Sequence, residues 1–256
     1  MTPPIFTPDG TEVEEVILPD GSKAFEVIAP DGTVVFVGDA IPDSVVNHYD
    51  ATEDERSLGD VSSVNDLIGE IDLQNGTQFE LIDSGISSGR SYELDGINDH
   101  LEWNNGGISP PFTWFTVVQV NSDHRGTVFD KGGGGTSDTV GGVEIREGNW
   151  EWRVGYNGVG EIITISASLN EPTLLVGYVD SDGDANFRVH DPNLTTNSEP
   201  GDYDGWPSFV DVGRDDRDQR YFDGLIGEIA LANDGYDDDP HLQSFEDDLL
   251  NKWGIE

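Results

Sequence analysis

From about residue 67 to the end of the chain, short apolar or alternating runs are separated by Gly, Asn and Asp. Runs of this length and spacing are typical of β-strands joined by turns. Many short strands with regular turn signals indicate a β-sandwich or a β-barrel. The strands are expected at 78–82, 91–94, 101–103, 113–120, 126–129, 143–146, 151–155, 162–166, 173–179, 186–189, 209–212 and 224–232.

One helix is expected after Pro240. Its apolar residues recur at roughly helical spacing, namely Leu242, Phe245, Leu249 and Trp253. Gly254 is a suitable residue to end the helix. The pattern therefore predicts an all-β protein that ends in a short helix.

The first 38 residues contain a repeat, in which the triplet PDG stands at 8–10, 19–21 and 30–32. Pro, Asp and Gly favour turns, and the segments between them are rich in Val, Ile and Phe. This predicts a three-stranded antiparallel meander over about 9–37, which is marginally stable alone. Its apolar residues are expected to pack on the main domain or to drive assembly into an oligomer, with a trimer favoured. The residues predicted for this contact are Phe25, Val27, Val35 and Val37.

Residues 39–66 are polar and poor in strand pattern, and they are expected to form a connector with a short helical turn around Ser44–His48. The predicted organisation is therefore a meander over 1–38, a connector over 39–66 and a large β domain over 67–256.

The composition is strongly acidic, with 52 Asp and Glu against 12 Lys and Arg and a formal net charge of −40. Repulsion among these charges opposes folding in ordinary saline, whereas molar salt shortens the Debye length to about 3 Å. We interpret the acidity as adaptation to a hypersaline medium; the alternative is an acidic face that collects calcium or a mineral. The sign of the charge excludes nucleic acid as a partner.

The chain has no cysteine, which excludes disulfides and thiol catalysis. The N-terminal sequence does not resemble a signal peptide, and no apolar run approaches the roughly 18 residues of a membrane span. Insertion into a membrane is therefore not expected.

Three stretches resemble parts of laminin-G-like, concanavalin A-like domains. SYELDGINDHLEW at 91–103 is similar to their opening strand pair, and 173–191 is similar to a central hairpin. Residues 221–255, with the strand GLIGEI and the ending KWGI, resemble the close of such domains. The resemblance covers about 67–256 and implies a two-sheet antiparallel jelly-roll sandwich.

An N-terminal strand region leads through GDAIPDSVVNHYD into this laminin-G-like domain. Together with the acidity, this order of segments is similar to virion surface proteins of tailed viruses that infect haloarchaea, such as tail-fibre or capsid-decoration proteins. It implies a non-enzymatic protein made in the host cytoplasm and displayed on the virion. The implied partners are further copies of the chain, other virion proteins and a host surface glycoprotein or glycan. The alternatives are a monomeric carbohydrate-binding module of a halophilic cell and a glycan hydrolase.

Catalytic carboxylates are not evident. Glycosidases of the resembled fold carry three acidic residues on one strand, and a retaining pair lies about 5–5.5 Å apart. Here Glu70 and Asp72 are followed by Gln74 and Asn75, and Glu228 stands alone. We therefore expect no enzyme and no required cofactor.

Two groups of acidic residues are candidate cation sites. Asp180, Asp182 and Asp184 alternate around Gly183, as at the start of a calcium loop, although the same sequence is an ordinary hairpin turn. Asp95 and Asp99 lie where some members of the resembled family bind calcium. A plain turn is the favoured interpretation at both places, with a structural calcium ion or another cation as the alternative.

Aromatic side chains are candidates for sugar binding, because their faces stack on sugar rings. The stretch NWEWRVGY places Trp150 and Trp152 on the same face of one strand, with Arg153 and Tyr156 close by. Tyr203 and Trp206 lie in a loop-like stretch. For Trp150 and Trp152 a place in the core is the favoured alternative, and for Trp206 burial and exposure are equally expected.

Scarce basic residues and a glycine-rich stretch complete the candidates. Arg214, Arg217, Arg220 and Arg188 are expected either to converge into a positive patch or to pair within the chain. The glycine-rich 130–142 is expected to be a rim loop.

Overall fold

The computed structural model describes residues 41–255 except 55, 69–70, 75, 84, 105–106, 132–141, 157–158, 192, 202–209 and 216–219, and four strand segments before residue 41. The chain divides into two units, Met1–Pro42 and Asp43–Glu256.

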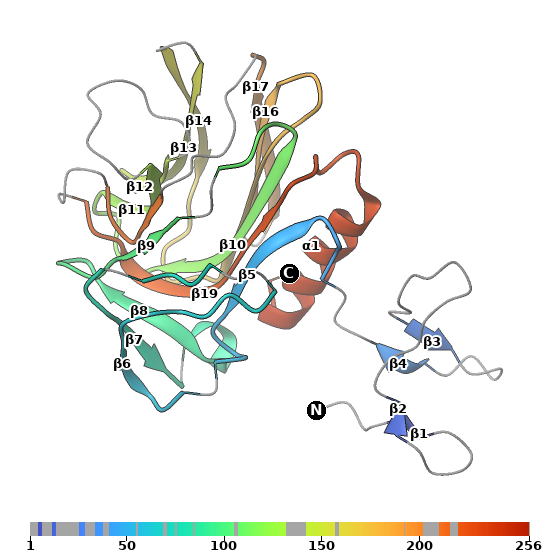
Figure 1. Cartoon of the computed structure of the whole chain (residues 1–256). Coiled ribbons are helices and arrows are strands. Elements are labelled where there is room, and N and C mark those ends of the chain that lie inside the picture. Colours follow the sequence, from blue (N-terminus) through green and yellow to red (C-terminus); the bar gives the residue numbers. More distant parts are fainter. Residues whose placement is uncertain are drawn as a thin grey trace. The chain divides into compact units, whose positions relative to one another are not determined.

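The described residues of the first unit form two short antiparallel pairs (Figure 1). Strand β1 (Ile5–Phe6) pairs with β2 (Glu12–Val13), and β3 (Glu26–Ile28) pairs with β4 (Val34–Val37). The strands described there therefore form two pairs instead of one three-stranded meander. Of the residues predicted for oligomerisation, Phe25 lies outside the described residues. Val27, Val35 and Val37 lie in β3 and β4, and their side chains are outside the description.

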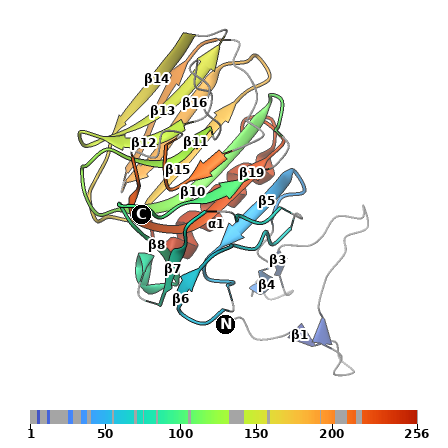
Figure 2. The same cartoon turned by 60° about the vertical axis from the view of Figure 1, so that its left-hand side comes forward.

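The second unit is a sandwich of a nine-stranded and a six-stranded sheet, in which all pairings between strands are antiparallel (Figure 2). This confirms the predicted two-sheet antiparallel fold. The larger sheet has the order β17-β16-β15-β10-β19-β8-β7-β6, with β5 also paired to β19. The smaller sheet has the order β14-β13-β12-β11-β18-β9.

The bounds of the larger sheet are β5 (Val45–Asp50), β6 (Gly59–Val61), β7 (Phe79–Ile82), β8 (Ser91–Asp95), β10 (Phe112–Val120), β15 (Thr173–Val179), β16 (Ala185–Asp191), β17 (Asn193–Glu199) and β19 (Asp223–Ala232). Those of the smaller sheet are β9 (Leu101–Trp103), β11 (Gly126–Lys131), β12 (Gly142–Arg146), β13 (Asn149–Tyr156), β14 (Val159–Ser166) and β18 (Val210–Val212). A 3-10 turn, η1 (Ile86–Ser88), precedes β8.

The core lies between the two sheets and is rich in tryptophan. Trp103, Trp114, Trp150 and Trp152 are at most 1% exposed. The rings of Trp114 and Trp152 meet edge to face at 5.5 Å. Gly177 is required beside Trp114, because a Cβ atom there would lie 2.3 Å from the indole ring.

Helix α1 (Pro240–Trp253) covers the outer face of the larger sheet, as Figure 1 shows. Phe245 packs edge to face on Phe115 of β10, with ring centroids 5.2 Å apart. Asp239 caps its N-terminus by accepting a hydrogen bond from the His241 backbone, and Gly254 ends it with φ 62°. The predicted helix is confirmed. Among the described residues, no helix has the length and apolar character of a membrane span.

The segment predicted as a connector contributes β5 and β6 to the larger sheet. Its prediction as a connector with a helical turn is wrong for these residues, because β5 buries polar side chains that hide the strand pattern. Asn47, His48 and Asp50 are all at most 5% exposed and are paired with other polar groups. The polar, exposed strand β17 was missed for a related reason, since it has no apolar face.

Candidate functional site

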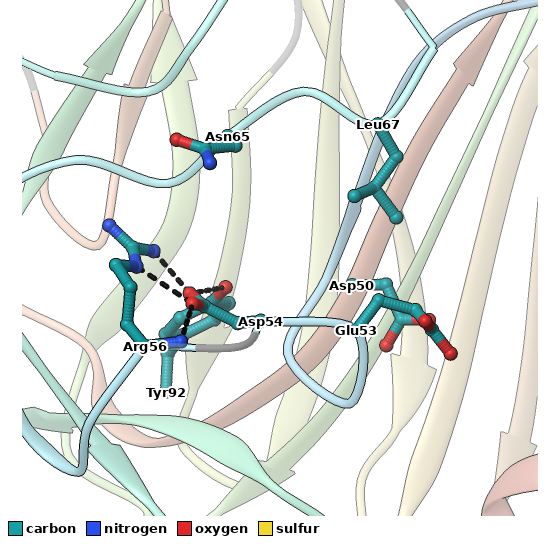
Figure 3. A pocket seen from close by; sticks show the side chains of 7 residues that line it. All are labelled: Asp50, Glu53, Asp54, Arg56, Asn65, Leu67 and Tyr92. Atoms are coloured by element: carbon teal, nitrogen blue, oxygen red, sulfur yellow. Dashed lines mark hydrogen bonds and ion pairs between the residues drawn. The ribbon is translucent and has the colours of Figure 1, made fainter.

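A pocket of about 370 Å³ lies where β5 ends, and we call it the β5 pocket (Figure 3). It is lined by Asp50, Glu53, Asp54, Arg56, Asn65, Leu67 and Tyr92. Pockets that bind small molecules usually measure about 300–1,000 Å³, so its size suits a small ligand.

One wall of the β5 pocket is held by hydrogen bonds, drawn as dashed lines in Figure 3. The Asp54 carboxylate accepts hydrogen bonds from Arg56 Nε at 2.7 Å and from the Tyr92 hydroxyl at 2.8 Å. Burial alone would raise the pKa of Asp54, but these hydrogen bonds lower it below its ordinary value. Burial and the Asp54 charge raise the pKa of Tyr92, so its hydroxyl stays protonated as the donor. This wall is therefore preorganised.

Other lining groups of the β5 pocket are open to a ligand. The side chains of Glu53 and Asn65 are exposed, and neither has a hydrogen-bond partner among the described residues. Leu67 is 42% exposed and supplies an apolar surface beside them. The pocket thus combines a free acceptor, a free amide and an apolar patch.

A buried polar cluster lies beside the β5 pocket and shares Asp50 with it. Glu228 accepts hydrogen bonds from His48 Nε2 at 2.5 Å and from Lys252 Nζ and Trp253 Nε1, both at 2.8 Å. Lys252 also donates to Asp50. These contacts fasten α1 to β5 and β19.

The charges of this cluster stabilise one another. Burial alone would raise the pKa of Glu228, but the His48 hydrogen bond and the Lys252 charge hold it below its ordinary value. Burial alone would lower the pKa of Lys252, but Glu228 and Asp50 raise it. Ligand atoms of His48, Asp50 and Glu228 lie within 4.8 Å of one another, as at a metal site. Lys252 already supplies the cation there, so a structural role accounts for the cluster.

A second polar cluster covers the outer face of the smaller sheet, and we call it the arginine cluster. At its centre the buried Glu144 accepts two hydrogen bonds from Arg125, at 2.8 and 2.9 Å. Arg153 and Arg220 donate to the same carboxylate, the latter at 3.4 Å. Burial alone would raise the pKa of Glu144, but the arginines lower it.

The predicted sugar-binding tryptophans are in the core. Trp150 and Trp152 are 0% and 1% exposed, so the prediction that they contact carbohydrate is wrong. They lie on the face of β13 that points toward the other sheet, where indole rings fill the core. Tyr156 ends β13, and its side chain is outside the description. Tyr203 and Trp206 lie outside the described residues.

The predicted calcium carboxylates at 180–184 hold a turn. Asp180 accepts hydrogen bonds from the backbone N–H groups of Asp182 and Asp184, at 3.0 and 2.9 Å. Asp184 accepts from the Gly201 backbone at 3.0 Å. These bonds account for two of the three aspartates as turn formers, and calcium binding there stays a prediction.

The carboxylates of the second predicted calcium site, Asp95 and Asp99, also accept hydrogen bonds from the backbone of a turn. Asp95 accepts from the backbone of Ile97 and Asn98, at 2.7 and 3.2 Å, and Asp99 accepts from the backbone of Asp95 at 2.9 Å. Burial raises the pKa of Asp99. Calcium binding here also stays a prediction.

Those of the four scarce arginines that the structure describes pair within the chain. Arg214 lies 2.9 Å from Asp211 and Arg220 lies 3.3 Å from Asp215, whereas Arg188 pairs with Glu246 of α1 on the other sheet. The expected patch therefore does not include Arg188. Arg217 lies outside the described residues, as does 132–141, most of the glycine-rich stretch.

Of the carboxylates considered for catalysis, Asp72 and Glu228 are among the described residues. Glu70 lies outside the described residues, and the exposed Asp72 accepts a hydrogen bond from the Asp66 backbone at 3.1 Å. Glu228 is 3% exposed beneath α1 and is enclosed by its partners. It is therefore out of reach of a substrate.

Comparison with known proteins supports the fold. No protein-family model matches the sequence, and no curated protein matches it. Among solved structures, the chain is similar to the receptor-binding domain of botulinum neurotoxin type G, with a TM-score of 0.58 and 13% identity over 80% of this chain and 51% of that one. It is also similar to the botulinum neurotoxin serotype D ligand-binding domain solved with N-acetylneuraminic acid, with a TM-score of 0.60 and 14% identity over 81% and 52%. The chain thus spans about half the length of these structures.

Proposed function

We propose that the sandwich is a non-enzymatic carbohydrate-binding module and that the β5 pocket holds one sugar unit of a glycan. Two observations support this proposal. The fold is shared with domains described as receptor-binding and ligand-binding, one of them crystallised with a sugar. The β5 pocket offers a fixed polar wall facing free polar groups.

The open groups of the β5 pocket carry the proposal. Glu53 can accept and Asn65 can both accept and donate, as vicinal sugar hydroxyls require, and Leu67 can cover the C–H face of a ring. The lining residues include three carboxylates against one guanidinium. This charge favours a neutral sugar over an acidic one, so the acidic sugar of the similar structure is not carried over.

The double variant Glu53→Gln/Asn65→Ala is expected to bind its glycan roughly 10- to 100-fold more weakly, because it changes two hydrogen-bonding groups of the pocket. The measurement is a screen of the full chain on an array of neutral and acidic glycans, followed by titration calorimetry with the best neutral one. Thermal stability should stay unchanged, because neither side chain has a partner among the described residues.

Glu171→Gln is the matched control, since Glu171 is exposed and lies outside the β5 pocket. It should bind like the unmodified chain. Equal affinities for all three proteins would contradict the assignment of the β5 pocket.

We also propose that the chain is displayed on the virion of a virus from a hypersaline habitat and attaches it to a host surface glycan or glycoprotein. The acidity of 52 against 12 charged residues and the separate first unit support this proposal. Under it, the strands before residue 43 form a homo-oligomer, with a trimer favoured, and bind other virion proteins. The alternative is a monomeric module of a halophilic cell.

The oligomeric state separates these two proposals. Light scattering after size exclusion, in about 2 M KCl to screen repulsion, is expected to give a trimer for the full chain. Phe25→Asp should give a monomer with an unchanged thermal transition, because a charge cannot be buried in an apolar contact without a partner. A monomeric full chain would favour the cellular module.

A further inference from the structure

We infer that the arginine cluster on the outer face of the smaller sheet is a second saccharide site, which takes the carboxylate or sulfate group of an acidic sugar. This site lies on the opposite sheet from the β5 pocket. The inference does not depend on the proposed neutral-sugar function.

The arginine cluster is layered by depth. Strands β12 and β13 alternate, so that Val143, Ile145, Trp150 and Trp152 enter the core while Glu144, Arg146, Glu151 and Arg153 face outward. The Glu144 and Asp215 side chains are 4% and 1% exposed. The arginines above them are 22–41% exposed, namely Arg125, Arg146, Arg153 and Arg220. A solute therefore meets guanidinium groups first.

The guanidinium groups at the centre of the cluster have N–H donors that Glu144 does not use. An ionised carboxylate has about four acceptor sites, and Glu144 receives four hydrogen bonds from Arg125, Arg153 and Arg220. Each guanidinium carries five N–H donors, so most of theirs remain for solvent or a ligand. Arg153 Nε is buried without a partner among the described residues. Glu151 Oε2 is likewise buried without a hydrogen-bond partner among the described residues. An added oxyanion would therefore bind the exposed N–H groups of the guanidinium layer.

Arg146 is the most available of these groups. Its closest carboxylate is Glu151 at 4.0 Å, and its side chain is 41% exposed. An ion pair that long and exposed contributes little, so Arg146 can turn toward a ligand at small cost.

An apolar side chain next to the guanidinium groups favours a sugar over a simple anion. Ile162 of β14 lies directly across from Arg153 and is 46% exposed. Exposed Thr164 lies across from Glu151 in the same strand pair. A ring that places its acidic group over the arginines could rest its C–H face on Ile162 and reach the Thr164 hydroxyl.

The surrounding charge limits the ligand to a short one. The four arginines face Glu144, Glu151 and Asp215, and Asp130 lies beside Gly142 on the same sheet. The local charge is therefore nearly balanced, within a chain of net charge −40. A long polyanion would be repelled, whereas one acidic group can be accommodated by the exposed guanidinium layer.

The test is titration of the full chain with four probes at fixed KCl: a hyaluronan tetrasaccharide, a sulfated heparin tetrasaccharide, a neutral chitin tetrasaccharide and tetra-aspartate. Saturable binding of at least one acidic saccharide is expected, about 10-fold tighter than the neutral one. Binding of the hyaluronan fragment alone identifies the carboxylate as the group recognised, and binding of the heparin fragment alone identifies the sulfate.

Arg146→Gln removes a charged donor and Ile162→Ser removes the apolar surface, so each should weaken that binding by about 3- to 10-fold. Both variants leave the Glu144 contacts intact. Their thermal transitions check that the sandwich is folded. Glu53→Gln/Asn65→Ala should bind the acidic saccharide normally, which separates this site from the β5 pocket. Three results would overturn the inference: no saturable binding of either acidic saccharide, equal binding of the neutral saccharide or of tetra-aspartate, and unchanged affinity in both variants.

Discussion

Replacing Trp152 with alanine is expected to lower the free energy of unfolding by about 3–5 kcal/mol. Trp152 is 1% exposed and contacts Trp114 and Phe187, with ring centroids 5.5 and 6.0 Å away. Its removal would leave a cavity between the two sheets, where both sides are held by strand pairing and cannot collapse. Since domains are typically stable by only about 5–15 kcal/mol, this loss is a large fraction.

The measurement is urea unfolding followed by fluorescence, in about 2 M KCl so that charge repulsion is screened. Trp152→Phe is the matched control. It keeps a ring in the core and removes an indole N–H that has no hydrogen-bond partner among the described residues, so its loss should be smaller. A loss below about 1 kcal/mol for Trp152→Ala would contradict a packed core at this position.

Replacing Lys252 with methionine is expected to cost a similar amount, about 3–5 kcal/mol. Its ammonium group lies between Asp50 and Glu228, both 3% exposed. Without it, two buried carboxylates lose their cation, although Glu228 keeps His48 and Trp253 as donors. Urea unfolding of the full chain measures the difference.

The pH dependence of this stability difference shows whether Lys252 acts through its charge. The pKa of Glu228 is held below its ordinary value in the native chain, so its stabilising contribution is present at neutral pH and is lost as the pH falls through that lowered pKa. In Lys252→Met the pKa of Glu228 should be lowered less, because the ammonium charge is gone. The stability difference between the two proteins should therefore shrink below about pH 4–5.

Lys252→Met/Asp50→Asn/Glu228→Gln is the second control. Because it removes the carboxylate charges together with the cation, it should regain part of the lost stability. A constant difference from pH 7 to pH 3, with no recovery in the triple variant, would mean that Lys252 acts through packing alone.

The local pattern of apolar runs between turn residues was enough to predict most strands of the sandwich. Strands such as β9 and β15 were predicted with the bounds that the structure gives, because an apolar run between turn residues specifies a strand. The helix followed from the spacing of Leu242, Phe245, Leu249 and Trp253, all of which are buried. These features depend on neighbours in sequence, so the sequence was enough to predict them.

The candidate sites depend on contacts between distant residues. Glu228 meets His48 across 180 residues, and Arg220 meets Glu144 across 76. The one local signal for the arginine cluster is the alternation of VEIR and EWR around apolar residues, which places charges on an outer face. For the β5 pocket there was no such signal, because the polar residues of β5 concealed the strand that forms its edge.

The tryptophan pair illustrates the limit of periodicity. Two residues apart in β13, Trp150 and Trp152 had to share a face, which the sequence predicted. Whether that face met solvent or the other sheet depended on the partner layer, which no local pattern specifies. The structure places both in the core.

The most direct test of the central claim, that a sugar occupies the β5 pocket, is hydrogen–deuterium exchange of the full chain with and without the best neutral glycan from the array. We expect slower exchange in the backbone around 50–67 and 90–94, which carries the lining residues, and unchanged exchange in β12–β14. Protection confined to β12–β14, or no protection at a saturating glycan concentration, would contradict the β5 pocket as the carbohydrate site.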